Sequence, residues 1–286
     1  MTFFKRVLFW GLAALVLAAL ATMALIRFWH IAPDDTISIR FDPNEAPLKS
    51  DLALLLRRGN YRLQTCCSHS TGVVSNIPGA LGPARRFEVR ASDTPIYGGY
   101  RSELRLRPNL MGRDFWYQGR VLLPADWTIS ATTVNIMQWR GTRDIIFGES
   151  TTVPPLALDV TGNRWRVLKA WDDRWISPDV PRVQGHRPIA SSPITPGQWT
   201  TWTFHMRWSP TSDGLVQIWK DGALLLDLPG PIGFNDLIGP YMKVGVYIPG
   251  WLENGLEKNV RARSVYFDEL TASATRSGLP IPIADD

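Results

Sequence analysis

From Thr36 onward the chain is a succession of short runs in which apolar and polar residues alternate, and glycine, proline, asparagine or aspartate ends each run. Alternation with a period of two predicts a β-strand with one buried face, because successive side chains of a strand point to opposite faces. The 23 glycines and 22 prolines supply the turns. No regular alternation of strands and helices is visible. We therefore expect an all-β fold, a jelly-roll or concanavalin-like sandwich of two antiparallel sheets.

The runs that predict strands are residues 37–41, 85–91, 100–107, 115–123, 133–140, 156–160, 164–170, 199–208, 216–220, 241–247 and 262–272. Lys220-Asp221-Gly222 predicts a hairpin turn, and residues 51–58 predict a short helix. We expect residues 33–275 to form the β-sandwich domain. Residues 1–32 precede it as an apolar helix and linker, and residues 276–286 follow it as a loose C-terminal tail.

The N-terminus carries an uncharged apolar run over residues 7–26, with Lys5 and Arg6 before it and Arg27 after it. About 20 apolar residues span a bilayer as a helix, and the basic flank keeps the N-terminus in the cytoplasm. Ala19-Leu20-Ala21 also resembles the small-residue site at which signal peptides are cleaved. An uncleaved membrane anchor and a cleaved signal peptide therefore both stay open. Either one predicts export to the periplasm or cell surface, inner-membrane-anchored or secreted.

Several classes of site are not expected from this sequence. The four histidines and two cysteines are too few for a zinc cluster, and we expect no cofactor, while a structural Ca²⁺ stays open. The adjacent Cys66 and Cys67 have no distant partner, which favours structural thiols or a labile bridge over catalysis. No nucleic-acid motif occurs. The paired carboxylates of retaining β-glucanases, typically E-x-D-x-E, are also missing.

Three of the predicted strands place long polar side chains on one face and apolar ones on the other. The polar sets are Arg101, Glu103 and Arg105; then Gln138 and Arg140; then Tyr241, Lys243 and Tyr247. If these strands are neighbours, their polar face is a basic, aromatic-lined groove. The net charge of +5 also fits a polyanionic partner. We therefore expect a monomer that binds an acidic polysaccharide; the alternative is that each polar face is only solvated surface.

The same three strands resemble jelly-roll polysaccharide lyases of the heparin lyase I-like family, to which glucuronan and alginate lyases are more distantly similar. Arg101-Ser102-Glu103-Leu104-Arg105 is similar to the family's R-[ST]-E-[LV]-R strand. Asn135-Ile136-Met137-Gln138-Trp139-Arg140 is similar to its I-x-Q-W-H strand, and Tyr241-Met242-Lys243-Val244-Gly245-Val246-Tyr247 to its Y-F-K-x-G-x-Y strand. With shorter supporting motifs, the similarity extends over residues 85–272.

The resemblance implies cleavage of uronic-acid linkages by β-elimination. By family position, Arg101 and Gln138 hold the substrate carboxylate and stabilise the dianion that develops on it. Tyr247 matches the catalytic tyrosine, and the positive charge of Lys243 is expected to lower its pKa. Glu103 is expected to orient Arg101. The other expected substrate contacts are Arg105, Arg140, Tyr241 and His205.

Arg140 stands where the family has a histidine. Arginine stays protonated in proteins and cannot act as a general base. Two interpretations follow. Either Tyr247 performs both proton transfers while Arg140 adds to charge neutralisation, or elimination has been lost. In the second case the groove belongs to a non-catalytic acidic-polysaccharide-binding protein of the envelope that assists exopolysaccharide assembly.

Overall fold

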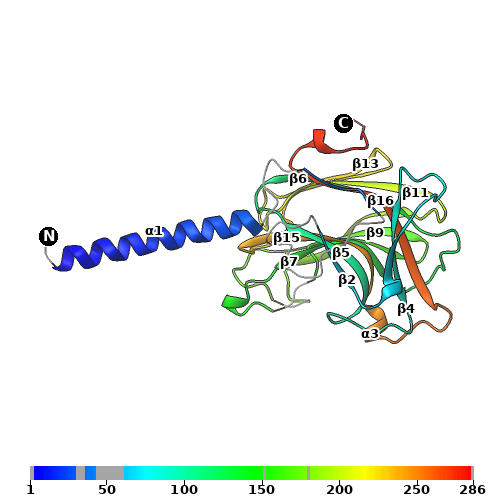
Figure 1. The fold of residues 1–286 in the computed structure, drawn as a ribbon, viewed down its shortest axis with the longest axis horizontal. Coiled ribbons are helices and arrows are strands. Elements are labelled where there is room, and N and C mark those ends of the chain that lie inside the picture. Colours follow the sequence, from blue (N-terminus) through cyan, green and yellow to red (C-terminus); the bar gives the residue numbers. More distant parts are fainter. Residues whose placement is uncertain (1–2, 30–35, 43–60, 151–152, 179–180, 285–286) are drawn as a thin grey trace.

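Two β-sheets packed face to face form the body of the molecule, and a long helix extends from it (Figure 1). The computed structural model describes residues 3–29, 36–42, 61–150, 153–178 and 181–284. The predicted all-β sandwich of two antiparallel sheets is confirmed. We name the two sheets after one inner strand of each, the β16 sheet and the β15 sheet.

The β16 sheet has the strand order β13-β12-β11-β6-β16-β4-β3, and β1 also pairs with β16. Its strands are β1 (Thr36–Ile39), β3 (Thr71–Val74), β4 (Ala84–Arg90), β6 (Asp114–Leu122), β11 (Trp199–Arg207), β12 (Leu215–Lys220), β13 (Ala223–Pro229) and β16 (Ala262–Ser273). All its pairings are antiparallel. The predicted hairpin turn joins β12 and β13, with Asp221 and Gly222 both at positive φ as a tight hairpin requires.

The β15 sheet has the strand order β10-β9-β8-β7-β15-β5-β2. Its strands are β2 (Arg62–Thr65), β5 (Tyr100–Pro108), β7 (Val134–Thr142), β8 (Leu156–Thr161), β9 (Arg164–Asp172), β10 (Gly185–Pro193) and β15 (Ile238–Ile248). The two-residue β14 (Gly233–Phe234) adds a parallel pair to β9. Short helical turns occur at η1 (Ser68–Ser70), η2 (Ile145–Phe147), α3 (Gly250–Glu253) and η3 (Arg276–Gly278).

Each of the runs that predicted a strand overlaps a strand of the structure. The strands that the sequence pattern missed include the four at the sheet edges, β2, β3, β10 and β13. These edge strands are short or largely exposed, and β10 contains proline. An edge strand does not need a fully buried face and tolerates proline. Its sequence therefore lacks the alternation that identifies a central strand.

The core lies between the two sheets and holds aromatic pairs that join them. Trp139 of β7 is fully buried and meets Tyr117 and Phe204 of the β16 sheet edge to face, with ring centroids 5.2 and 4.8 Å apart. Trp165 of β9 meets Trp202 of β11 at 5.6 Å. Such pairs add to the apolar area they bury. The tryptophan of the Gln-Trp motif is therefore a core residue.

The C-terminal residues are held against the β16 sheet, which corrects the expectation of a loose tail. The side-chain amide of the buried Gln118 exchanges two hydrogen bonds with the Ile281 backbone, at 2.8 and 2.9 Å. The Ala284 amide donates to the carbonyl of Gly222 in the β12–β13 turn. The predicted helix at residues 51–58 and most of the linker before Thr36 lie outside the described residues.

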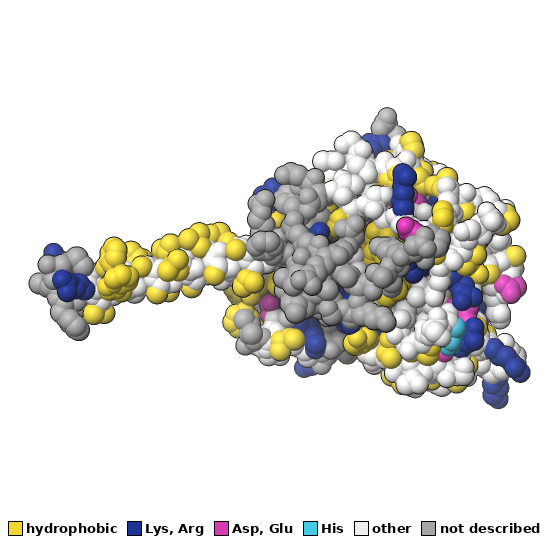
Figure 2. All heavy atoms as spheres, viewed as in Figure 1, with side chains coloured by type: hydrophobic (Ala, Val, Ile, Leu, Met, Phe, Trp, Pro, Cys, Tyr) yellow, Lys and Arg dark blue, Asp and Glu magenta, His cyan; other side chains and the backbone are white. Residues whose placement is uncertain are grey.

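The N-terminal helix α1 (Phe3–Trp29) is the only described helix long and apolar enough to cross a membrane, over Lys5–Leu25. None of this stretch is buried against the protein. Figure 2 shows hydrophobic side chains along it and basic side chains at its free end. Both an anchor and a signal sequence have these properties.

Candidate active site

The three strands with a polar face are neighbours in the structure. The β15 sheet contains them in the order β7-β15-β5, so the strand with the tyrosine motif lies between the other two. Their apolar side chains, such as Leu104, Met137 and Val244, point into the core and are fully buried. The polar side chains therefore share the outer face of the β15 sheet, as the alternation of the sequence predicts.

The strand register brings these polar residues into two rows across the sheet. Lys243 lies opposite Gln138 on one side and Arg105 on the other. Tyr247 lies opposite Arg101 on β5 and Asn135 on β7. Residues directly opposite in an antiparallel pair have side chains close enough to interact. One row therefore holds Arg105, Lys243 and Gln138, and the next holds Arg101, Tyr247 and Asn135.

Gly245 separates Lys243 from Tyr247 on this face and lies opposite Glu103. Its φ is +138°, a region that favours glycine. A Cβ at this position would collide with the Ser102 carbonyl oxygen of β5. The glycine of the tyrosine motif is thus required by the close approach of β15 and β5 beside the site.

Glu103 is the centre of the polar cluster. It is 2% exposed. One carboxylate oxygen accepts hydrogen bonds from Lys243 Nζ at 2.8 Å and Arg101 Nη1 at 3.2 Å, and the other accepts a bond from Gln138 Nε2. A charged group can be buried when it is paired and hydrogen-bonded in this way. Glu103 thus positions Arg101 and Gln138, which the family resemblance assigns to the substrate carboxylate, together with Lys243.

Tyr247 lies under the guanidinium group of Arg101. The Arg101 Cζ atom is 4.1 Å from the centroid of the Tyr247 ring, a cation–π contact. Arg101 Nη2 also donates to the Tyr97 carbonyl oxygen at 3.2 Å. A Cβ on Gly99 would lie 2.6 Å from Tyr247 Cε2, so the turn before β5 packs tightly on the ring. The positions of the tyrosine and the arginine are therefore fixed together.

The pKa of Tyr247 is raised, chiefly by burial, while the charges of Arg101 and Arg140 act to lower it. The net direction is opposite to the lowering expected from Lys243, because burial outweighs the nearby positive charges. Lys243 is buried and paired with Glu103 on the neighbouring strand. Burial lowers the pKa of Lys243 itself to about 8, against the opposing effect of Glu103.

A groove of about 530 Å³ opens over this cluster. It is lined by Arg62, Gln64, Tyr97, Gly98, Arg101, Arg105, Gln138, Arg140, Gly141, Arg143, Tyr241, Lys243 and Tyr247. The guanidinium group of Arg105 lies over the Tyr241 ring, 3.9 Å from its centroid. Of the residues predicted for the site, Arg101, Arg105, Gln138, Arg140, Tyr241, Lys243 and Tyr247 thus line one groove, with Glu103 bonded to three of them.

His205 is not part of this groove, contrary to the expectation that it contacts substrate. It lies on β11 of the β16 sheet and stacks on Trp116, with ring centroids 4.1 Å apart. Its ring nitrogens lie 2.7 Å from Gln217 and 3.1 Å from Asp114. The alternation in the sequence correctly places His205 away from the core. It could not reveal that β11 belongs to the other sheet.

The groove also contains residues that the sequence did not identify. Arg62 on the edge strand β2 donates a 2.6 Å hydrogen bond to the hydroxyl of Tyr97, in the turn before β5. Arg143 follows β7 directly. Tyr97 and Arg143 lie a few residues from the family motifs in the sequence, and this nearness could have marked them as groove residues. Arg62 lies in an edge strand that the pattern missed.

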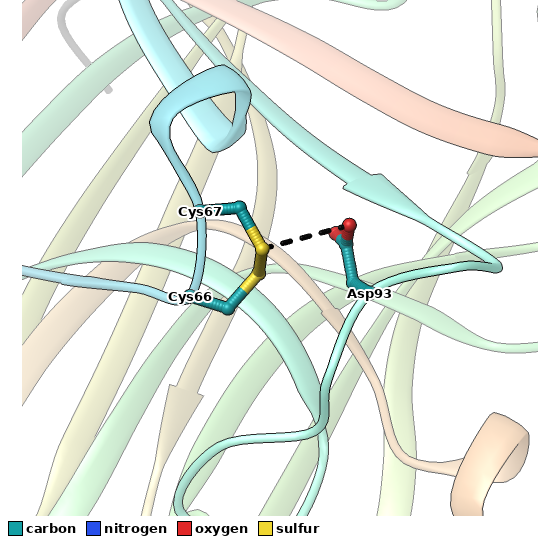
Figure 3. Close-up of side chains that lie close together, drawn as sticks. All are labelled: Cys66, Cys67 and Asp93. Carbon is teal, nitrogen blue, oxygen red and sulfur yellow. Dashed lines mark hydrogen bonds between the residues drawn. A yellow bond between two sulfur atoms is a disulfide. The ribbon is translucent and has the colours of Figure 1, made fainter.

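Beyond Arg62, a further hollow of about 510 Å³ contains Cys66 and Cys67, which form a vicinal disulfide (Figure 3). This agrees with the expectation of a bridge or structural thiols. Asp93 lies beside the pair, 3.8 Å from Cys67 Sγ, and also accepts a 2.8 Å contact from His69. Among the described residues, these two sulfurs and the Asp93 carboxylate are the one group close enough to hold a metal ion. The disulfide leaves no thiolate to ligate it.

A neighbouring hollow of about 510 Å³ extends the groove past Arg140 and Tyr247 onto β8, β9 and β10. Its lining includes Asn135, Asp159, Arg166, His186 and Glu253. Arg140 and Tyr247 line both hollows. The outer face of the β15 sheet thus offers a continuous elongated surface, with the tyrosine near its middle, which is suited to an extended polymer.

A family model described as polysaccharide lyase matches residues 57–271, which include the sandwich strands from β2 to β16. The chain belongs to this polysaccharide lyase family. The match contains all the strands that form the groove, so the groove lies within the family's own domain.

Solved structures with the same fold include lyases. An endo-β-1,4-glucuronan lyase from the fungus Trichoderma reesei superposes with a TM-score of 0.61 at 20% sequence identity, covering 74% of this chain and 90% of that one. An alginate lyase of polysaccharide lyase family 7 gives a TM-score of 0.51 at 14% identity, covering 75% and 94%. No curated protein matches the chain. At these identities the likeness concerns the fold.

Proposed function

We propose that this polysaccharide lyase cleaves a uronic-acid-containing anionic polysaccharide by β-elimination, in the manner of the heparin lyase I-like group. The observation that carries the proposal is the convergence of Arg101, Gln138 and Lys243 beside Tyr247 in one open groove. Cations and an amide next to a phenol are the groups that this reaction needs. They neutralise a carboxylate and exchange a proton with the carbon beside it.

Arg101 and Gln138 hold the uronate carboxylate in this mechanism. Gln138 binds Glu103 through its amide nitrogen, and its buried Oε1 has no hydrogen-bond partner in the described structure. Oε1 can accept a hydrogen bond from a substrate hydroxyl, and the second N–H of the same amide can donate to the uronate carboxylate. Arg101 supplies the charge that stabilises the enolate-like dianion. Arg140 adds a second positive charge at the point where the family has a histidine.

Tyr247 carries the proton. As a phenolate it takes the C5 proton of the uronate, the C5–H electrons form the C4=C5 double bond, and the C4–O4 bond breaks with its electrons going to the oxygen. The same phenol then protonates that oxygen, so protons and electrons balance without a co-reactant. Burial keeps the phenol protonated in the empty groove, since it raises the pKa, and Arg101 and Arg140 favour the phenolate.

A second candidate function is binding without cleavage, and Arg140 is the observation that favours it. An arginine cannot replace the proton transfers of a histidine, so the family reaction depends here on Tyr247 alone. If the groove binds without cleaving, it is a polyanion-binding surface of an envelope protein. Under either function, the apolar helix α1 exports the sandwich domain, as an anchor or as a signal sequence.

The test is a screen of uronate polymers with the full-length protein in detergent. Absorbance of the C4=C5 double bond conjugated to the carboxylate measures elimination. We expect product with the wild type and a loss of about a hundred- to ten-thousandfold for Tyr247→Phe, with binding retained. Tyr266→Phe on the β16 sheet is the matched control and should be unaffected. Salt-sensitive binding without unsaturated product from any polymer would favour the binding function.

A further inference from the structure

The two parts of the groove differ in charge. The part over β2, β5 and β15, which we call the cationic half, is lined by Arg62, Arg101, Arg105, Arg140, Arg143 and Lys243. No carboxylate lines it among the residues that the structure describes; Glu103 lies below, bonded to Arg101 and Lys243. Arg101 and Lys243 share the single counter-charge of Glu103, and Arg140 adds a further positive charge, so this half has an excess of positive charge that fits anionic sugar units.

The part over β8, β9 and β10, which we call the balanced half, has no such excess. Arg166 forms a two-pronged ion pair with Asp159, at 2.9 and 3.2 Å, so the two charges cancel. Glu253 on α3 offsets Arg140, which this half shares with the other. The remaining described lining contains uncharged polar groups, His186 and apolar side chains, among them Val153, Pro154 and Leu168.

The reaction fixes which sugar lies in which half. The uronate that loses its C5 proton must have its carboxylate at Arg101 and Gln138, in the cationic half. Its O4 must reach Tyr247, because the phenol protonates that oxygen. Tyr247 borders both halves. The sugar whose anomeric carbon is joined to this O4 consequently continues past Tyr247 into the balanced half.

Building on the proposed lyase function, we propose that the sugar joined to O4 of the cleaved uronate is uncharged. The substrate is then a heteropolysaccharide in which the cleaved uronate carries a neutral sugar on its O4. A carboxylate or sulfate on that sugar would meet Glu253 and would find Arg166 already paired with the buried Asp159, and like charges at an interface suppress binding. Apolar side chains beside polar ones suit a neutral sugar, including one with an N-acetyl or methyl group.

The first test compares polymers that differ only in charge on that sugar. Unsulfated chondroitin carries a neutral N-acetylhexosamine on O4 of each glucuronate, and its hexosamine-sulfated form adds charge there. Hyaluronan extends the neutral set, and polyglucuronate and alginate extend the charged set. With the full-length protein we expect kcat/KM and affinity to favour the neutral set by at least about tenfold.

The second test changes the charge of the balanced half. Glu253→Lys should narrow the preference for unsulfated over sulfated chondroitin by about tenfold or more. Because Glu253 also raises the pKa of Tyr247, the ratio between two substrates is the readout, and an effect common to both cancels. Asp126→Lys makes the same charge change at an exposed turn outside the described groove lining. It should leave the ratio unchanged.

The outcomes separate this inference from the lyase function. Binding of the neutral set without cleavage of any polymer would refute the lyase and leave the specificity standing. Cleavage or binding of the charged set at least as good as that of the neutral set would overturn the specificity and leave the lyase standing. An Asp126→Lys ratio that shifts as much as that of Glu253→Lys, or no binding of either set, would also overturn it.

Discussion

Replacing Glu103 with glutamine tests the central role of this carboxylate in the site. Glu103 is 2% exposed, and its partners Arg101 and Lys243 have side chains that are 9% and 4% exposed. Glutamine keeps the size and one acceptor oxygen but removes the charge. Arg101 and Lys243 are then two buried cations that have lost their ion pair with Glu103.

Removing one partner of a buried ion pair typically costs about 3–5 kcal/mol, because the remaining charge stays buried. We expect Glu103→Gln to lower the free energy of unfolding by about 3 kcal/mol near neutral pH, the low end of that range, because the amide oxygen still accepts one bond. Glu88→Gln is the matched control. Its partners Arg86 and Arg90 are 30% and 44% exposed, so its cost should stay within about 1 kcal/mol.

The cost of Glu103→Gln should depend on pH through Lys243. In the folded wild type the pKa of Lys243 is about 8, below its ordinary 10.5. Below pH 8 the buried lysine is charged and needs Glu103. Above it the folded protein has released this proton while the unfolded chain still binds it, so stability rises with pH in this window. The penalty of the substitution should therefore be greatest below pH 8 and decrease above it.

The assay is urea unfolding of the full-length protein in detergent, followed by tryptophan fluorescence, at several pH values on either side of 8. Activity on the best uronate polymer should fall as well, because Arg101 and Gln138 lose their common partner. A cost no larger than that of Glu88→Gln would refute the role of Glu103. So would a cost that does not change as pH rises through the pKa of Lys243.

Three further predictions concern other parts of the molecule. Arg140→His should give little or no gain in kcat/KM. It should also weaken substrate binding and reduce the dependence of that binding on salt, because a positive charge leaves the groove. A clear rise in kcat would mean that the site lacks only the family histidine. Asp236→Asn should stabilise the fold at pH 8 by on the order of 1–3 kcal/mol and hardly at pH 4, as measured by urea unfolding. Burial and the charges of Glu149 and Asp144 raise the pKa of Asp236 from 3.8 to about 8, so the native state loses stability as pH rises between these values. Mass spectrometry of the mature protein should find the intact N-terminus if α1 is an anchor, whereas a new N-terminus near Thr22 or Ala24 would indicate a cleaved signal peptide.

The central strands and the faces of their residues could be predicted from the sequence, because a strand with one buried face has a period of two. The sequence therefore correctly places Arg101 and Tyr247 on the polar face, and the residues that alternate with the polar ones, such as Leu104 and Met242, are buried in the core. That the three strands of the family motifs are neighbours is a condition of the predicted groove, and the strand order meets it. Edge strands such as β10 were missed because their exposed residues need no alternation.

Contacts between strands far apart in the chain could not be predicted from the sequence. Lys243 and Tyr247 are four residues apart on one face, which suggested an interaction between them. The structure instead pairs Lys243 with Glu103 of β5. The balanced half of the groove depends in the same way on Asp159, Arg166 and Glu253 from three separate elements. No motif joins these residues, and only the strand order brings them together.

The most direct measurement of the central claim is the mass of the product released from a uronate polymer by the wild-type protein. Elimination leaves a C4=C5 double bond, so the oligosaccharide is lighter by one water than the product of hydrolysis, and it absorbs in the ultraviolet. We predict this lighter product from the wild type and its loss in Tyr247→Phe. A product with the mass expected of hydrolysis, or an unsaturated product that Tyr247→Phe still releases at the wild-type rate, would contradict the account.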